Sequence, residues 1–460
     1  MTAFIVALSD AEALDPDCVG PKAANLARLA RADLPTPGGF CLTAAAYRAQ
    51  VAALGLDDLL RRFSPSSPAE ARKISVEIRL ALYQQPIADN ILQPLLAAWR
   101  AQGASACSGK VDAGFPTTTC ASAKEVERIP IHSIAMRPSG RPGAVRSSAL
   151  IEDRAGANFA GQFESFLGLA DEAEFLTAVR ACWAALWTSQ ARRAMASLGL
   201  DPAGTAMAVL IQPLVAARAS GGALSQTPEG GMLLSATWGL GSAIAQGEVV
   251  PDRIVLSRQG FVRKIEAGRK DRRETCAHGE GTRTQAVPDD LVQTPCLDAG
   301  AAVTLGRLLR KAEHIMGMPI EIEWALDDAG FKLLQARPLH VQPIVVPDEI
   351  WLQHPGLSGH PAGIGWGSGR AVVVSCECEL SRVAPGDVLV TKVAGPALAH
   401  ILPRVAGVVA ELGGSTSHLA SLARERGIPM VLGVLDATRR IPDGSQVAVD
   451  GVAGIVRWLR

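Results

Sequence analysis

GGSTSHLASLARERGIP, residues 413–429, sets a glycine pair, a run of three hydroxyl residues and a histidine directly before a helical pattern. Leu419, Leu422 and Ala423 follow at the spacings that place side chains on one face of a helix. His418 is therefore expected in the first helical turn. Free backbone N–H groups in that turn favour a neutral imidazole and stabilise an anion beside it.

The surroundings of His418 leave both a structural and a chemical role open. Gly413 and Gly414 let a bulky group come close to the backbone. Either Thr416 or Ser417 can cap the helix that follows. A single histidine near a helix start is more often structural or solvated than reactive, so the local pattern does not decide between the two roles.

The composition excludes several classes of protein. A length of 460 residues predicts two or three domains, and 48% hydrophobic residues are enough for their cores. Lys plus Arg and Asp plus Glu both number 45, so no basic excess indicates a nucleic-acid or membrane-surface partner. Aromatic residues make up only 4%, which argues against a surface that stacks bases.

The first residues and the cysteines predict a cytoplasmic protein. MTAFIVALSDAEALD lacks the basic segment of a signal peptide, and no run of about eighteen apolar residues predicts a membrane span. The nine cysteines are scattered, and Cys376 and Cys378 form a close pair without a second pair to complete a zinc site. We expect reduced thiols.

Periodicity and turn residues divide the chain into an α/β region and a smaller final domain. We predict a module over 1–340 with a loop insertion at about 103–133, a linker over 341–360 and a domain over 361–460. Helical spacing predicts one helix in 81–102 and one in 175–200. Apolar runs predict strands, with a hairpin at the end, over 207–215, 232–240, 331–339, 371–375, 386–393, 407–412 and 445–459.

GGSTSHLASLARERGIPMVLGV, residues 413–434, resembles the phosphohistidine segment of the phosphoenolpyruvate synthase, pyruvate phosphate dikinase and rifampin phosphotransferase family. The resemblance continues through PGDVLV and VAVDGVAGIV, so it covers the final domain. It implies that His418 carries a phosphoryl group, and that Thr416 stands where the dikinase branch has a regulatory phosphorylation site. The implied fold is α/β (α+β), an ATP-grasp-type two-lobed nucleotide-binding module followed by a small β/α swivelling domain.

The N-terminal region also resembles this family. VGPKAANLARL places Lys22 at the phosphate-binding lysine, with Pro21 where the family usually has glycine. GAVRSSALIEDRAGANFAGQFESFLGL places Arg146 at the arginine that clamps the transferring phosphates. Gly161 and Ser165 in the same stretch match a small loop over the phosphates.

Three further segments resemble the strands that hold the nucleotide. MAVLIQPLV makes Gln212 the adenine-side contact, with the backbone of Leu214 beside it. IEIEWAL and LLQARPL resemble the metal-binding strands, so Glu323 and Gln335 would bind Mg²⁺ and Arg337 would face the phosphates. The resemblance implies ATP as substrate and Mg²⁺ as cofactor.

The implied activity is that of a dikinase-type phosphotransferase. His418 would take a phosphoryl group from ATP, releasing AMP and phosphate, and pass it to an acceptor. Larger relatives carry a third module that binds the acceptor. In this chain the predicted linker over 341–360 is too short to contain such a module between the two domains. The acceptor would then be a small molecule bound between the domains or would sit on a separate subunit. A nonenzymatic regulator, or an ATP-grasp ligase that releases ADP, remains an alternative.

Overall fold

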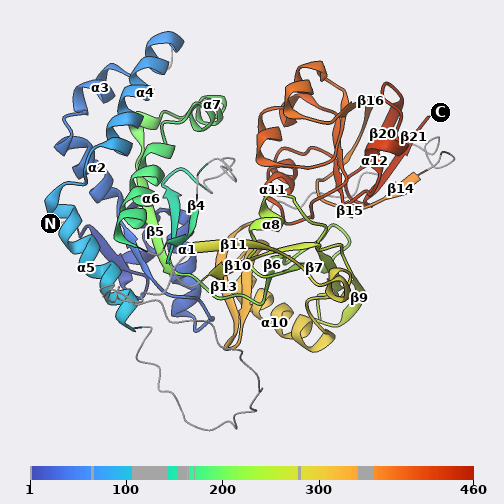
Figure 1. The fold of residues 1–460 in the computed structure, drawn as a ribbon, viewed down its shortest axis with the longest axis horizontal. Helices are drawn as coiled ribbons and strands as arrows, with labels where there is room; N and C mark the ends of the chain where they lie inside the picture. The colour runs from blue at the N-terminus through green and yellow to red at the C-terminus, as the bar shows by residue number, and fades with distance from the viewer. Residues whose placement is uncertain are drawn as a thin grey trace, which may run out of the picture.

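The protein folds into three α/β units (Figure 1). The computed structural model describes residues 3–63, 67–105, 143–152, 163, 165–169, 171–277, 281–339, 354 and 356–459. We call residues 3–213 the first lobe, 219–338 the second lobe and 356–459 the C-terminal unit. In the described part of the chain, no helix has the length and apolar character needed to cross a membrane.

The first lobe is an antiparallel sheet covered by helices, with strand order β1-β2-β5-β3-β4. Its strands are β1 (Ile5–Ala7), β2 (Phe40–Leu42), β3 (Gly143–Ala149), β4 (Ser165–Leu169) and β5 (Met207–Pro213). Its helices are α1 (Pro16–Arg31), α2 (Ala44–Ala53), α3 (Asp57–Arg62), α4 (Pro68–Gln84), α5 (Asp89–Ser105), α6 (Glu172–Ala185) and α7 (Ser189–Ser197). Phe175, Trp183 and Trp187 fill its core.

The two predicted helices of this lobe are each two helices, so both predictions of a single helix were wrong. Gln85 precedes a proline and adopts an extended conformation, which ends α4 and separates it from α5. Thr188 is also extended, and its hydroxyl accepts a hydrogen bond from the Ala191 N–H at 3.2 Å. This cap begins α7 as a separate helix after α6 has ended.

The second lobe is a six-stranded antiparallel sheet in the order β13-β12-β6-β7-β8-β9, with one long helix packed on it. Its strands are β6 (Ala219–Leu224), β7 (Met232–Trp238), β8 (Asp252–Leu256), β9 (Val262–Glu266), β12 (Ile320–Asp327) and β13 (Gly330–Pro338). A separate hairpin pairs β10 (Arg272–Ala277) with β11 (Gly281–Ala286). The helices are α8 (Ser242–Ala245), α9 (Asp289–Val292) and α10 (Ala299–Met316). The strands predicted over 207–215, 232–240 and 331–339 are confirmed as β5, β7 and β13.

The C-terminal unit has an eight-stranded sheet in the order β14-β21-β20-β16-β17-β18-β19-β15, whose centre, β16 to β19, is parallel. Its elements are β14 (Gly356–Ser358), β15 (His360–Pro361), β16 (Trp366–Val374), β17 (Val388–Thr391), β18 (Gly407–Ala410), α11 (His418–Glu425), β19 (Met430–Leu432), α12 (Ala437–Arg440), β20 (Gln446–Asp450) and β21 (Ile455–Trp458). The predicted strands and final hairpin are confirmed.

Two predictions about this part of the chain need correction. Residues 356–358 form β14 and residue 360 begins β15 of the sheet, instead of belonging to a linker, because they pair with β21 and β19. The rest of the predicted linker, except His354, and almost all of the predicted insertion at 103–133 lie outside the described residues. Cys376 and Cys378 form a disulfide instead of free thiols, since the turn that carries them brings their Cα atoms to 5.4 Å.

The C-terminal unit joins the second lobe by close backbone packing instead of a shared apolar core. Among the described residues, the apolar cluster of the second lobe takes in Leu29 and Leu34 of the first lobe, but none from the C-terminal unit. The Gly413 N–H donates to the Val249 carbonyl at 3.1 Å. A Cβ on Gly414 would lie 2.3 Å from the ring of Pro251, so the glycine permits this approach.

His360 on β15 also lies at this junction, against Val250 of the second lobe and Gly433. Its Nδ1 atom is buried and has no hydrogen-bond partner among the residues that the structure describes. Burial, and after it the charge of Arg253, lowers the pKa of His360 to about 4, although Glu266 and Asp252 act in the opposite direction. The folded protein therefore holds this imidazole in its neutral form.

We predict that His360→Gln removes part of the acid sensitivity of the protein. Because the folded pKa is lower than that of an exposed histidine, the unfolded chain binds the proton more tightly. Stability should thus fall as the pH decreases from about 6.5 to about 4, by up to about 1.4 kcal/mol per pH unit. The melting temperature should change less over this window in His360→Gln than in wild type. The exposed His314→Gln serves as control, and equal pH slopes in wild type and His360→Gln would contradict the assignment.

Candidate active site

A cavity of about 580 Å³ lies where the three units meet. Its walls come from α1, β3, β4 and β5 of the first lobe, β6, β12 and β13 of the second lobe, and the start of α11. The described residues predicted for the site all line it: Lys22, Arg146, Ser165, Gln212, Leu214, Glu323, Gln335, Arg337 and His418. Gly161, also predicted, lies outside the described residues.

Lys22 is held in place by a kink in α1. Gly20 has a φ of 76°, and a Cβ there would lie 2.3 Å from the Ser148 carbonyl oxygen, so the chain needs glycine to pass β3. The Lys22 ammonium then lies 2.8 Å from the Glu152 carboxylate and donates to the Ser147 carbonyl at 3.0 Å. The lysine is thus fixed at the cavity wall with a paired charge.

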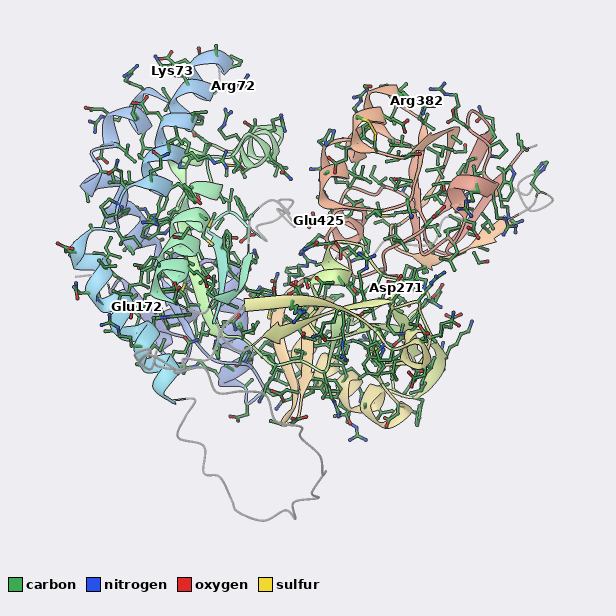
Figure 2. All side chains as sticks on the ribbon, viewed as in Figure 1. Arg72, Lys73, Glu172, Asp271, Arg382 and Glu425 are labelled. Atoms are coloured by element: carbon green, nitrogen blue, oxygen red, sulfur yellow. A yellow bond between two sulfur atoms is a disulfide. The ribbon has the colours of Figure 1, made fainter. Side chains whose placement is uncertain are left out.

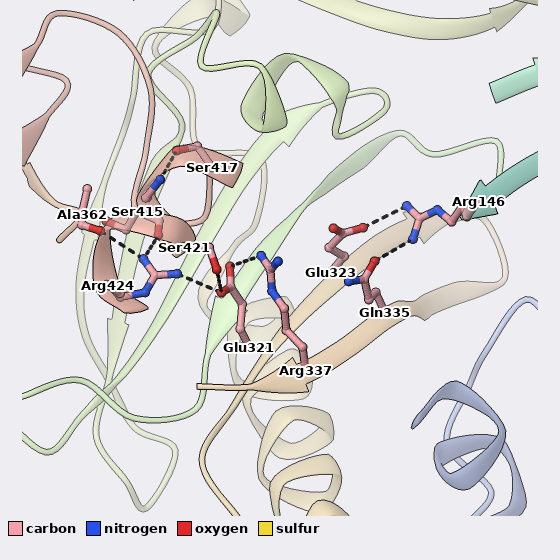
Figure 3. Close-up of polar contacts among 11 residues, drawn as sticks. Arg146, Glu321, Glu323, Gln335, Arg337, Ala362, Ser415, Ser417, Ser421 and Arg424 are labelled. Atoms are coloured by element: carbon pink, nitrogen blue, oxygen red, sulfur yellow. Dashed lines mark hydrogen bonds and ion pairs between the residues drawn. The ribbon is translucent and has the colours of Figure 1, made fainter. Parts of the chain in front are cut away.

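Arg146 on β3 reaches across to the second lobe and bridges two neighbouring side chains (Figure 3). Its guanidinium donates to the Glu323 carboxylate at 2.9 Å and to the Gln335 Oε1 at 3.3 Å. Glu323 and Gln335 stand opposite each other on β12 and β13, which brings both side chains to one face of the sheet. Burial opposes ionisation of Glu323, but the nearby positive charges, Arg146 first, lower its pKa to about 2.

This pair of oxygen ligands fits a hard divalent cation. An ionised carboxylate and an amide oxygen stand side by side at the cavity wall, and both already accept from a cationic group. The described residues contain no group of three or more His, Cys, Asp or Glu side chains that could bind a metal alone. Further ligands would therefore come from a bound molecule or water, as Mg²⁺ commonly accepts.

Another part of the cavity wall is formed by the end of β5 and the residues after it. Gln212 is 3% exposed, and its amide donates to the Gly38 carbonyl at 3.4 Å. Leu214 lines the cavity just beyond. Ser165, at the start of β4, pairs with Arg146 in the strand register and is exposed.

His418 is the first residue of α11 and lines the same cavity. Ser417, and not Thr416, caps the helix by accepting from the Ala420 N–H at 3.2 Å. Burial lowers the pKa of His418, although Glu323 opposes this. A neutral imidazole was expected from the helix end, whereas its main cause here is burial in the cavity.

Arg337 makes contacts that the sequence did not predict. Its guanidinium lies 3.2 Å from one oxygen of Glu321, a buried residue on β12. The other Glu321 oxygen accepts from Arg424 at 2.8 Å and from Ser421 at 3.2 Å, both on α11 (Figure 3). Alternation along IEIEWAL places Glu321 and Glu323 on the same face of the strand. This pattern could have indicated that Glu321 lies near the site. No local pattern indicated Arg424.

Two family models match this chain. "Pyruvate phosphate dikinase, AMP/ATP-binding domain" matches residues 16–113 and 115–348. "PEP-utilising enzyme, mobile domain" matches residues 383–454. The first model alone covers more than half of the chain, and the second contains His418 and Arg424.

Relatives named phosphoenolpyruvate synthase are similar over much of the chain. That of Aeropyrum pernix is 31% identical over 95% of this chain and 56% of its own length. That of Pyrococcus furiosus is 30% identical over 96% of this chain and 57% of its own. The Escherichia coli K12 enzyme is 33% identical over 68% of this chain and 42% of its own. The chain thus spans about half the length of the curated relatives it matches.

We predict that Gly414→Ala exposes His418. The added Cβ would collide with the Pro251 ring and separate the C-terminal unit from the second lobe. Modification of His418 by diethyl pyrocarbonate, followed by mass spectrometry, should become several-fold faster than in wild type. Gly395→Ala is the control, because a Cβ there meets nothing within 4 Å. An unchanged rate in Gly414→Ala would show that the contact does not hold the two units together.

Proposed function

The chain belongs to the phosphoenolpyruvate synthase and pyruvate phosphate dikinase family, and on that basis we propose that it transfers a phosphoryl group from ATP to its own His418 and then to an acceptor. The observation that carries the proposal is the position of His418. It lines one cavity with Lys22, Arg146 and Arg337, three cations suited to a triphosphate.

The cavity also suits the other parts of a nucleotide. Its volume of about 580 Å³ is in the range of small-molecule sites. Gln212 and Leu214 would contact the adenine side, and Ser165 would lie over the phosphates. Glu323 and Gln335 would hold Mg²⁺, which would neutralise phosphate charge; Arg146 would then move from these two side chains to the phosphates.

The neutral imidazole of His418 is the nucleophile of the proposed reaction. One ring nitrogen attacks the β-phosphorus of ATP, and the bond from the β-phosphorus to the oxygen that bridges it to the α-phosphorus breaks. AMP leaves, and a pyrophosphoryl-histidine forms. Cleavage of the terminal phosphate by water releases phosphate, or by phosphate releases pyrophosphate, and phosphohistidine remains. Lys22, Arg146 and Arg337 act by positioning the phosphates and neutralising their charge.

The phosphorylated histidine must leave the cavity to reach its acceptor. His418 is half-buried and faces the cavity where the three units meet, so an acceptor on a separate subunit would need this side chain to turn outward. We propose that the C-terminal unit moves away as a body and presents the phosphoryl group to a small acceptor or to an acceptor on a separate subunit. The weak apolar connection between this unit and the second lobe supports the movement.

Incubation of the purified protein with Mg-ATP and no acceptor tests the first half-reaction. We expect one AMP per protein and an acid-labile phosphate on His418, measured by chromatography and mass spectrometry. His418→Ala should bind ATP and form neither product. ADP without a labelled histidine would contradict the proposal and favour a ligase or a simple kinase.

Arg146→Met should slow the phosphorylation of His418 by about 100-fold or more, because a clamp on the transferring phosphates is lost. The measurement is single-turnover labelling at saturating Mg-ATP. Arg100→Met is a matched control in the same lobe, since Arg100 makes an exposed ion pair with Glu172 and neither residue lines the cavity. Equal rates in Arg146→Met and Arg100→Met would exclude Arg146 from the reaction.

A further inference from the structure

Glu321 is a buried carboxylate shared by two arginines from different units of the protein. Arg337 comes from β13 of the same lobe and lies 3.2 Å away. Arg424 comes from α11 of the C-terminal unit and lies 2.8 Å away. All three side chains are less than a tenth exposed. Figure 3 shows the carboxylate between the two guanidinium groups.

Arg424 is held within its own unit by one terminal nitrogen, and its other terminal nitrogen donates a hydrogen bond to the second lobe. One of its terminal nitrogens donates to the carbonyl oxygens of Ala362 and Ser415. The other donates to Glu321, beside the Ser421 hydroxyl that donates to the same oxygen. The contact to Glu321 therefore exists only while α11 is docked on the second lobe.

Arg337 differs from Arg424 because it also lines the cavity. A phosphate chain there offers it anionic oxygens that compete with Glu321. Without such a chain, the two arginines repel each other across one carboxylate. Burial lowers the pKa of Arg424; Glu321 opposes that effect, and the charge of Arg337 adds to it.

We propose that Glu321 couples occupancy of the cavity by a nucleoside triphosphate to docking of the C-terminal unit. When the phosphates bind Arg337, their negative charge neutralises its repulsion of Arg424. Glu321 then pairs with Arg424 alone, so α11 stays docked and holds His418 at the phosphates. When the products leave, Arg337 returns to Glu321, the hold on Arg424 weakens, and the unit is released. Arg424 and Glu321 are thus positioning residues for His418. The inference rests on the proposed function for the identity of the ligand.

Substitution of the two arginines should have opposite effects on docking. Arg424→Met removes the contact across the junction and should lower the docking equilibrium about tenfold or more. Arg337→Met removes the repulsion and should raise the docked fraction even without nucleotide. Misfolding could lower the docked fraction of Arg424→Met, but it could not raise that of Arg337→Met. The increase expected in Arg337→Met therefore cannot be explained by misfolding. Glu321→Gln should abolish the response to nucleotide.

Single-molecule FRET between fluorophores at Phe261 and Arg439 measures docking directly. Both positions are exposed, one on the second lobe and the other on the C-terminal unit. Noncanonical amino acids carry the dyes, because the chain has nine cysteines. The ligands are the Mg²⁺ complex of adenosine 5′-(β,γ-imido)triphosphate, which has the full phosphate chain, and AMP, which has one phosphate.

In wild type we expect the triphosphate analogue to raise the docked fraction several-fold and AMP to leave it unchanged. Arg382→Met is the matched control, since Arg382 pairs with Asp443 at an exposed site of the same unit. Figure 2 shows Arg382 far from Glu425 of α11. The docked fraction of Arg382→Met should respond to the triphosphate analogue as that of wild type does. A full response in Arg424→Met, or a lower docked fraction in Arg337→Met, would overturn the proposal.

A kinetic measurement separates this inference from the proposed function. Arg424→Met should keep the wild-type Kd for the analogue in calorimetry, while its single-turnover labelling of His418 falls in step with its docked fraction. Docking that responds to the analogue without any labelling by ATP would refute the phosphotransferase and leave the coupling intact. Labelling without a docking response would refute the coupling alone.

Discussion

The buried junction of Glu321, Arg337 and Arg424 is the interaction on which the rest of the site depends. It fixes α11 against β12, and α11 brings His418 into the cavity. Burial there keeps the imidazole neutral and strengthens every charge interaction around it. The proposed transfer from His418 to an acceptor requires that this junction can also open. An ion pair meets both demands, because water can solvate its members once they separate.

The cations of the cavity are each paired with a carboxylate. Lys22 faces Glu152, Arg146 faces Glu323, and Arg337 faces Glu321. Pairing lets three positive charges line one cavity without destabilising the fold through mutual repulsion. Under the proposed function, binding of a triphosphate would be an exchange of partners, in which phosphate oxygens replace carboxylates. The carboxylates released by the exchange are free to bind a metal ion, as proposed for Glu323, or another arginine, as proposed for Glu321.

Most of the fold could be predicted from local sequence, and the junction could not. The apolar runs of β5 and β13 and the pattern of the final hairpin are local signals, so they were sufficient. The break between α6 and α7 depends on one threonine cap inside a continuous helical pattern, which periodicity alone does not separate. For the site, the family resemblance led to residues that line one cavity, among them Lys22 and Gln335. Arg424 lies 103 positions from its partner and looks like an ordinary charged residue of an amphipathic helix, so only the docked structure pairs them.

The spacing of two residues between Glu321 and Glu323 would let one strand take part in both the proposed phosphoryl transfer and the proposed domain movement. Side chains at i and i+2 share a face of β12 and lie roughly 7 Å apart, close enough for one phosphate chain to affect both. Glu323 faces Arg146 of the first lobe, and Glu321 faces Arg424 of the C-terminal unit. A triphosphate that draws Arg146 and Arg337 toward itself changes the partners of both carboxylates in the same event. Lobe contacts and domain docking can therefore respond together, without a separate signal passing through the protein.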